Sequence, residues 1–486
     1  MVFSSLFFLY VFLPLNLVFY VFAKDLRAKN TVMIIFSLIF YAWGEPVYLL
    51  LLIAMAFADW LLAQYIGSKP YRSFGARFGL VAACVVNLGL LAVFKYGTFF
   101  AENTHALFGF PAVIPSIALP IGISFYTFQL LSYVVDVYRG EVPPQRSFKI
   151  LLLYVSLFHQ CIAGPIVRYK DVENELMQRS SSVREISQGV SRFTVGLAKK
   201  ALLANICGQL ADTLLLSDAA AAGADAVTVL MGRPALSLWL GVLAFTLQIY
   251  LDFSAYSDMA IGMGLMIGFH YKENFDYPYT SHTVAEFWRR WHMSLGSFFR
   301  DYVYIPLGGN RKGKRRTYVN MFVVWLLTGF WHGASWNFML WGLYFFLFLV
   351  LERAFLKEKL EALPAIVSRI YLLAVVYFGW ILFKFRDLSL VGRTLLGMFG
   401  LNGNGFTNFE VNSVLGSHLF ILILCILACT PVVKYLSAAL ENLGRRWAPV
   451  GAVNSLLRIA CPILLLVLST AALVGNSYNP FLYFQF

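Results

Sequence analysis

A histidine lies inside a long uncharged stretch of this chain. Residues 320–351, NMFVVWLLTGFWHGASWNFMLWGLYFFLFLVL, contain no Asp, Glu, Lys or Arg, and His332 falls in their first half. An ionisable ring in a segment apolar enough to enter a bilayer must face protein or a water-filled cavity, and its default interpretation is functional. Small residues that allow a helix to break and flat aromatic residues surround it, namely Gly329, Gly333, Ala334, Trp331 and Trp336. The alternative is a core histidine bonded to a neighbouring carbonyl group.

A second histidine follows a pattern typical of an amphipathic helix. Thr283 and Glu286 have capping-box spacing, which marks a helix start. One face of the following helix is apolar, with Val284, Phe287, Trp288, Trp291, Leu295, Phe298 and Phe299. His292 lies on that face, one turn after Trp288, so we expect it to point into the membrane body; the alternative is a histidine at the membrane surface. Segment 270–317 is rich in Lys and Arg, which predicts a cytoplasmic, interfacial amphipathic segment.

Carboxylates interrupt other apolar runs. Residues 234–269 exceed the about 20 residues that one span needs, so we expect a bend near residues 254–257. Asp252 and Asp258 lie beside that bend, where they either coordinate a ligand or cap helix ends and pair with the neighbouring basic segment. Asp136 is expected to form a structural salt bridge with Arg139.

The composition identifies a polytopic membrane protein. The chain has 486 residues, of which 59% are hydrophobic and 13% charged, and a mean hydropathy of +0.70. Its net charge of +13 comes from Lys and Arg in short loops between apolar runs, a pattern that follows the positive-inside rule and argues against a nucleic-acid interface. The six cysteines lie in or beside apolar runs without metal-ligand spacing, which predicts neither a disulfide framework nor a zinc site.

The distribution of charge predicts the topology. The first charges follow the apolar run at residues 1–23, which predicts a retained first span with the N-terminus outside. Residues 158–169 have basic flanks on both sides, so we expect a re-entrant segment that contains His159, a weaker candidate than His332. Residues 352–369 are expected to be cytoplasmic like 270–317, which makes 320–351 a re-entrant pair of short helices that meet near residues 329–335.

Several motifs spread over most of the chain occur together. They are MVFSSLFFLYVFLPL (1–15), ISFYTFQLLSYVVDVYRG (123–140), IAGPIVRY (162–169), DFSAYSDMAIGMG (252–264), FWRRWHMSLGSFFRDYVYIPLGGNR (287–311), LLTGFWHGASWNFMLWG (326–342) and NPFLYFQF (479–486). With these motifs the chain resembles the membrane-bound O-acyltransferases, in the bacterial branch that includes alginate O-acetyltransferase-like and teichoic acid D-alanylating proteins. His159 departs from this pattern, because many relatives have proline there.

The resemblance implies a fold and a set of site residues. The fold is all-α, with one membrane domain over 1–486, family motifs at about 120–345, and about ten or eleven spanning helices, plus re-entrant and interfacial helices, around a central tunnel. The signature histidine maps onto His332, and the second polar position maps onto His292. Candidate substrate-binding residues are Trp288, Trp331, Trp336, Asn337 and Asp252, with no metal ligand.

The resemblance also implies an activity. An acyl group, most simply acetyl, passes from a cytoplasmic thioester on coenzyme A or a carrier protein to an extracellular polysaccharide such as alginate. No bound cofactor is implied. The chain would lie in a bacterial inner membrane, and its partner would be an extracytoplasmic acetyltransferase of the SGNH or DHHW type. His332 would act as the general base, and residues 311–316 would either attract an anionic donor or simply obey the positive-inside rule. The competing functions are a transporter and a non-catalytic scaffold for a periplasmic acetyltransferase.

Overall fold

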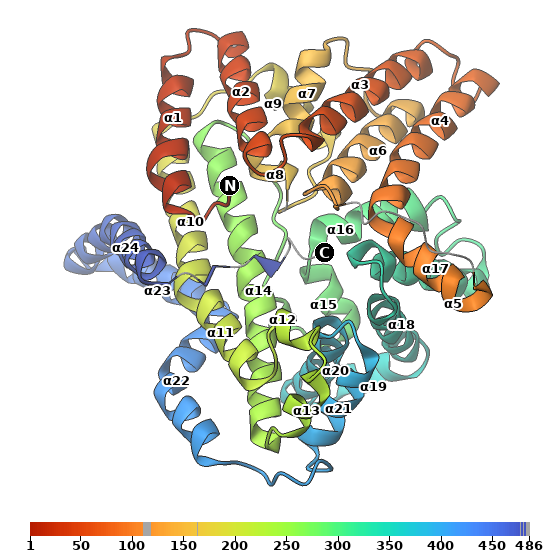
Figure 1. The fold of residues 1–486 in the computed structure, drawn as a ribbon. Helices are drawn as coiled ribbons and strands as arrows, with labels where there is room; N and C mark the ends of the chain where they lie inside the picture. Colours follow the sequence, from red (N-terminus) through yellow and green to blue (C-terminus); the bar gives the residue numbers. More distant parts are fainter. Residues whose placement is uncertain (110–117, 163, 477, 480, 483–486) are drawn as a thin grey trace. The chain divides into compact units, whose positions relative to one another are not determined.

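The computed structural model describes residues 1–109, 118–162, 164–476, 478–479 and 481–482 (Figure 1). Within these residues the secondary structure is helical and includes no β-strand. Seven helical segments are long and apolar enough to cross a membrane. The resemblance implies about ten or eleven spans, more than the seven found among the described residues, and some apolar runs form shorter helices, such as Phe8–Phe22. The chain is therefore an all-α polytopic membrane protein.

The helices belong to two compact units, each made of discontinuous stretches of the chain. Unit 1 comprises Met1–Phe193, Tyr256–Glu273 and Ser297–Pro306, and unit 2 comprises Thr194–Ala255, Asn274–Gly296 and Leu307–Phe486. Helices α10 (Val183–Ala198), α14 (Ala235–Met266) and α16 (Met293–Phe299) contribute residues to both units. The prediction of a single domain over 1–486 stays a prediction.

Unit 1 holds the N-terminal helices. Its elements, with short π-helical or 3-10 segments labelled η, are η1 (Phe8–Phe12), α1 (Leu13–Phe22), α2 (Leu26–Gly44), α3 (Tyr48–Gly67), α4 (Phe74–Leu91), η2 (Ala92–Tyr96), α5 (Gly97–Phe108), α6 (Ile123–Arg139), α7 (Phe148–Ser156), α8 (Phe158–Cys161), α9 (Tyr169–Met177) and η5 (Arg300–Tyr304). The chain takes a left-handed turn directly before α6: Gly122 has φ +78°, and a Cβ there would meet the Cys161 carbonyl oxygen at 2.6 Å. The chain breaks between α7 and α8 at residue 157, and the re-entrant segment over 158–169 stays a prediction.

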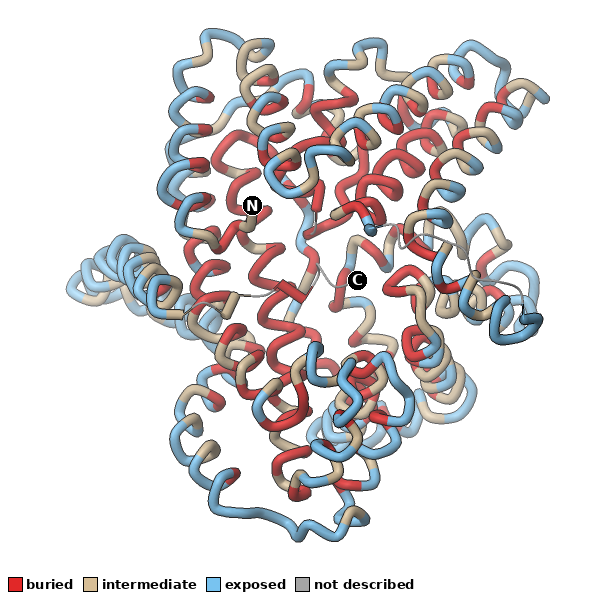
Figure 2. The backbone as a smooth tube through the Cα atoms, in the orientation of Figure 1, coloured by how far each residue is buried: buried red, intermediate tan, exposed pale blue. Residues whose placement is uncertain are grey.

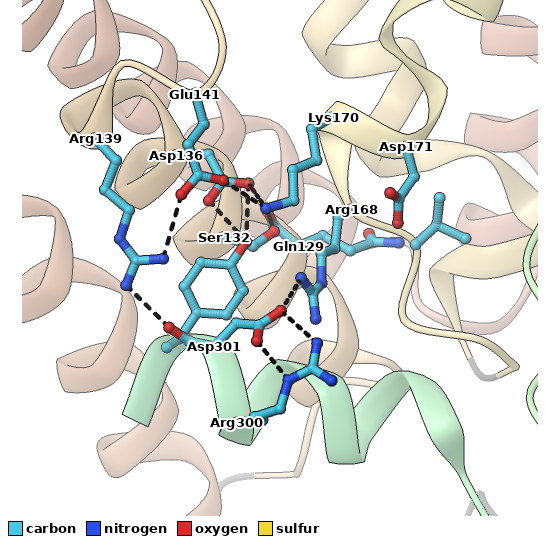
Figure 3. Close-up of polar contacts among 12 residues, drawn as sticks. Gln129, Ser132, Asp136, Arg139, Glu141, Arg168, Lys170, Asp171, Arg300 and Asp301 are labelled. Carbon is cyan, nitrogen blue, oxygen red and sulfur yellow. Dashed lines mark hydrogen bonds and ion pairs between the residues drawn. The ribbon is translucent and has the colours of Figure 1, made fainter. Parts of the chain in front are cut away.

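Ion pairs join α6, the start of α9 and η5 within unit 1 (Figure 3). Arg168 Nη1 lies 2.7 Å from Asp301 Oδ2, and Lys170 Nζ lies 3.5 Å from Asp136 Oδ2. The Tyr302 hydroxyl donates to Asp136 at 2.8 Å. The expected pair between Asp136 and Arg139 is wrong, because Lys170 is the cation at Asp136 and Arg139 donates to the Asp301 carbonyl oxygen instead.

Unit 2 holds the remaining elements. They are η3 (Lys199–Ala204), α11 (Asn205–Leu214), α12 (Asp218–Ala221), α13 (Ala226–Met231), η4 (Pro278–Thr280), α15 (Val284–Arg290), α17 (Gly313–His332), α18 (Trp336–Leu351), η6 (Glu352–Leu356), α19 (Lys357–Ala362), α20 (Ala365–Lys384), α21 (Leu388–Met398), α22 (Phe409–Ala428), α23 (Val432–Arg446) and α24 (Ala448–Gly475). Its core combines apolar and aromatic side chains of α11, α14, α15, α18, α20 and α22.

The helices differ in how much of their surface is buried (Figure 2). In α14, 78% of the most apolar window is buried, whereas in α24 only 6% is buried. A helix as apolar as α24 that leaves its surface uncovered is suited to contact with lipid. The predicted bend in α14 near residues 254–257 is wrong: one uninterrupted helix runs from Ala235 to Met266, and its two acids, Asp252 and Asp258, pair with Lys200 of η3 and Arg192 of α10.

Candidate functional site

His332 is the last residue of α17, and α18 begins after a break of three residues. The two helices of the pair meet at 333–335, as the sequence predicts. Their backbones pack closely where two glycines, Gly329 and Gly342, face each other. A Cβ added to Gly342 would meet the Trp325 carbonyl oxygen and would lie 3.2 Å from the Cα of Gly329. This contact fixes the end of α17 against α18, and with it the ring of His332, which is 7% exposed.

A small cavity lies beside His332 within unit 2. Its volume is about 10 Å³, and its walls are Ile249, Asp252, Phe253, Trp291, His332, Trp341, Trp380, Phe383 and Leu482. The His332 ring packs edge-on against Trp341, with centroids 5.0 Å apart, and against Phe383 at 5.3 Å. A cavity of this size has room for about one water molecule, so bulk solvent is excluded from the imidazole.

His292 lies between α15 and α16 and interrupts the single amphipathic helix that the sequence predicts. The predicted helix start is confirmed, because the Glu286 N–H donates to Thr283 Oγ1 at 3.0 Å, but the Glu286 carboxylate accepts from the His282 N–H at 2.8 Å rather than closing the capping box. Helix α15 ends at Arg290. His292 has φ +46°, a left-handed conformation that is uncommon for a residue other than glycine. Such backbone strain persists only where the surroundings impose it, and it is common at functional sites.

Hydrogen bonds fix the tautomer of His292. Asn274 Oδ1 accepts from the backbone N–H of Ser294 at 3.2 Å and from Ser294 Oγ at 2.9 Å. The same oxygen lies 3.2 Å from His292 Nδ1. Because this oxygen can only accept, Nδ1 carries the proton and Nε2 is the basic nitrogen.

The two histidines share an aromatic neighbour. Trp331 packs against His332 with ring centroids 5.0 Å apart and against His292 at 6.0 Å. Burial, and then the charge of a protonated His332, hold the pKa of His292 well below its usual value. His292 is 2% exposed, so it lies inside the protein, as predicted from its place on the apolar face.

The other predicted site residues separate into two groups. Asp252 lines the cavity, and Trp288 packs edge-on against Trp341 with centroids 5.4 Å apart. Asn337 instead donates to the Leu382 carbonyl oxygen at 3.0 Å, and Trp336 is 55% exposed at the start of α18. These two positions therefore lie away from the cavity, and the substrate-binding roles of the five residues stay predictions.

Sequence reasoning missed most of the cavity wall. Trp341, Trp380 and Phe383 lie on α18 and α20, inside uniformly apolar runs where no residue type stands out. The paired cation of Asp252 was missed as well: Lys200 Nζ lies 2.7 Å from Asp252 Oδ1. The only signal for Lys200 was its position at the start of the apolar run that forms η3 and α11.

The arrangement is suited to acid–base chemistry in a dry site. A neutral imidazole enclosed by aromatic rings can accept a proton from a hydroxyl group and return it to a leaving group. No group of three or more His, Cys, Asp and Glu side chains placed to hold a metal ion occurs among the described residues.

Comparisons with known proteins agree with this chemistry. A model of the membrane-bound O-acyltransferase family matches residues 145–385. The chain is 36% identical to a "probable alginate O-acetylase" of Azotobacter vinelandii over 100% of both chains. It is 32% identical to the peptidoglycan O-acetyltransferase of Helicobacter pylori, over 83% of this chain and 80% of that protein. It is 25% identical to the teichoic acid D-alanyltransferase of Bacillus subtilis, over 55% of this chain and 68% of that protein. The chain therefore belongs to the membrane-bound O-acyltransferase family and is an O-acyltransferase.

Proposed function

We propose that this protein transfers an acetyl group from a cytoplasmic thioester across the membrane for O-acetylation of an extracellular polysaccharide such as alginate. The names of the relatives that match over most of their length support acetyl as the group and a cell-envelope polymer as the acceptor. The observation that carries the proposal is His332, a buried imidazole beside a small, mostly apolar cavity.

His332 is the general base of this reaction. The acceptor hydroxyl oxygen attacks the thioester carbonyl carbon while His332 takes the hydroxyl proton, and the carbonyl electron pair moves onto oxygen. The tetrahedral intermediate then re-forms the carbonyl group and breaks the carbon–sulfur bond, and the thiolate takes the proton back from His332. A positioned base of this kind contributes typically about 100- to 10,000-fold to the rate.

The donor approaches the side of the membrane that carries the basic segments. Arg311, Lys312, Lys314 and Arg315 are exposed at the start of α17. Coenzyme A thioesters and carrier-protein thioesters are both anionic, so a basic surface favours the encounter with either one. The donor is a substrate, and the proposal includes no bound cofactor.

The acceptor side needs a further protein. In the proposed arrangement the protein lies in a bacterial inner membrane with its N-terminus outside, and an SGNH- or DHHW-type acetyltransferase receives the acetyl group there. The positive-inside distribution of charge supports this orientation.

A membrane assay tests the proposal. Inverted membrane vesicles that contain the protein and the periplasmic acetyltransferase receive radiolabelled acetyl-CoA or acetylated carrier protein on the outside, with polysaccharide enclosed. The proposal predicts labelled polysaccharide with the wild-type protein. Movement of unmodified polysaccharide without label would instead identify a transporter, and neither label transfer nor polysaccharide movement would identify a scaffold.

A further inference from the structure

The indole nitrogen of Trp341 is a buried donor without a hydrogen-bond partner. Trp341 lies on α18 and is 1% exposed, and no described residue accepts a hydrogen bond from its Nε1. Buried indole N–H groups nearly always find an acceptor, because an unmade hydrogen bond costs on the order of 1–3 kcal/mol. An unpaired donor of this kind in a cavity wall is available to bind a ligand atom.

The indole ring of Trp341 lies beside the reactive histidine. Its ring packs edge-on against His332 at 5.0 Å and an interplanar angle of 83°, and both residues line the cavity of about 10 Å³. Trp341 directly precedes Gly342, the glycine at the close crossing of α17 and α18. The backbone contact at this crossing therefore holds the indole against the end of α17, where His332 lies.

The charge of the cavity limits what the donor can bind. Its only carboxylate is that of Asp252, which is already held by Lys200 at 2.7 Å and by the N–H of Leu482 at 2.9 Å. The remaining walls are apolar or aromatic apart from His332. The cavity therefore suits a small, uncharged oxygen as the acceptor for the indole N–H.

We propose that Trp341 Nε1–H donates a hydrogen bond to the carbonyl oxygen of the acyl group and stabilises the negative charge that this oxygen acquires. The proposal rests on the acyl transfer proposed above. When the acceptor hydroxyl attacks, the carbonyl π electrons move to this oxygen and His332 takes the hydroxyl proton. The bond to Trp341 strengthens as the charge develops and weakens when the carbonyl re-forms and the thiolate leaves. Trp341 is thus a catalytic residue, and no proton leaves its indole.

The expected effect is large because the donor is fixed in a water-excluded site. Removal of one such donor costs typically about 100- to 1,000-fold in kcat. The ground-state carbonyl oxygen carries little charge, so KM for the thioester changes much less than kcat. Loss of an unpaired donor leaves the folded protein without any broken internal hydrogen bond.

The test replaces the indole by a phenyl ring. Trp341→Phe keeps an aromatic ring beside His332 and removes the N–H, and Trp325→Phe makes the same change at a neighbouring indole outside the cavity wall. With acetyl transfer measured per mole of folded, membrane-inserted protein, we expect kcat of Trp341→Phe to fall about 100- to 1,000-fold below that of Trp325→Phe. The thermal midpoints of the two variants should agree. A kcat for Trp341→Phe within about threefold of the control overturns the inference.

A second measurement uses the wild-type protein and does not depend on how the variant folds. A methyl ketone analogue of the acetyl thioester, with CH2 in place of sulfur on a pantetheine arm and ¹³C at the carbonyl, serves as the infrared probe. A hydrogen bond from Trp341 lowers the carbonyl stretching frequency of the bound probe below its value in an apolar solvent, and Trp341→Phe should abolish that shift. An unshifted frequency in the wild-type protein contradicts the inference. Absence of acetyl transfer by the wild-type protein would contradict the proposed function itself.

Discussion

Lys200 Nζ lies 2.7 Å from Asp252 Oδ1, and the two side chains are 1% and 2% exposed. The pair joins η3 to the middle of α14, and the Phe481 ring packs 4.2 Å from the ammonium group. Burial of two charges is tolerable only while each compensates the other, because each ion alone would lose its hydration without an opposite charge. Asp252 is therefore a charge-neutralised wall of the cavity rather than an open anionic site.

Lys200→Met leaves the Asp252 carboxylate buried without its cation. We expect the free energy of unfolding to fall by about 3–5 kcal/mol, the usual effect of breaking a buried pair. Lys200→Met combined with Asp252→Asn removes both charges and should recover most of that loss. Thermal unfolding in detergent compares the three proteins; equal midpoints for wild type and Lys200→Met would show that the pair contributes no stability.

His332→Ala tests the general base. We expect acetyl transfer per mole of inserted protein to fall by about 100-fold or more, since a positioned acid–base group is lost. Expression and thermal stability should stay close to those of the wild type, because removal of a buried polar ring relieves its desolvation. A structural histidine predicts the reverse, with lower stability and near-normal specific activity of the folded fraction.

The α17–α18 pair makes a topological prediction. Arg353 Nη1 in η6 lies 3.8 Å from Met321 Sδ in the middle of α17, so the segment that follows α18 packs beside α17 within unit 2. Cysteines at the exposed positions Lys314 and Lys357 should therefore react with an impermeant maleimide from the same side of the membrane. Labelling from opposite faces would disprove a re-entrant pair. Because both segments are basic, we expect that side to be cytoplasmic.

Close packing of the pair predicts a large effect at Gly342. A Cβ there would meet the Trp325 carbonyl oxygen, so Gly342→Ala must push α17 and α18 apart. We expect a loss of about 1–3 kcal/mol in stability, as for an overpacked core, together with lower acetyl transfer. Gly416→Ala on α22 is the matched control, because its Cβ would have no neighbour within 4 Å. Similar stabilities of the two variants would show that the crossing can relax.

His270 makes the stability of unit 1 depend on pH. Its Nδ1 lies 2.8 Å from Glu175 and its Nε2 lies 3.0 Å from Glu185, which links α9 to α10. The hydrogen bond to Glu175 is the main cause that raises the pKa of His270 above its ordinary value of 6.5. A raised pKa means that the folded protein binds this proton more tightly, so its stabilising effect is present below about pH 6.5 and is lost as pH rises through the higher folded pKa.

His270→Gln isolates this effect. We expect the variant to have a lower thermal midpoint than the wild type near pH 6 and the same midpoint near pH 9. The difference should be small, because the histidine side chain is 51% exposed and water screens the pair. A midpoint difference that is constant across this range would assign the contribution of His270 to packing rather than to its charge.

The sequence alone determined the membrane class, the helical composition and the positions of both histidines. These features follow from local chemistry. A run without charge needs a bilayer or a core, the spacing from Thr283 to Glu286 marks a helix start, and a histidine inside an uncharged run must find a polar or enclosed environment. The break after His332 was also predictable, because glycine and small residues follow it.

Only the tertiary structure decided which side chains meet. Asp136 pairs with Lys170 rather than with nearby Arg139, and Asp252 pairs with Lys200 across a long stretch of chain. The strength of an ion pair depends on the distance between the two charges and on their burial. Both quantities depend on how the helices pack rather than on spacing along the chain. The contact between Trp341 and His332 also depends on tertiary packing. The apolar run around Trp341 predicts a buried helix, but only the packing of α17 against α18 places the indole ring beside His332.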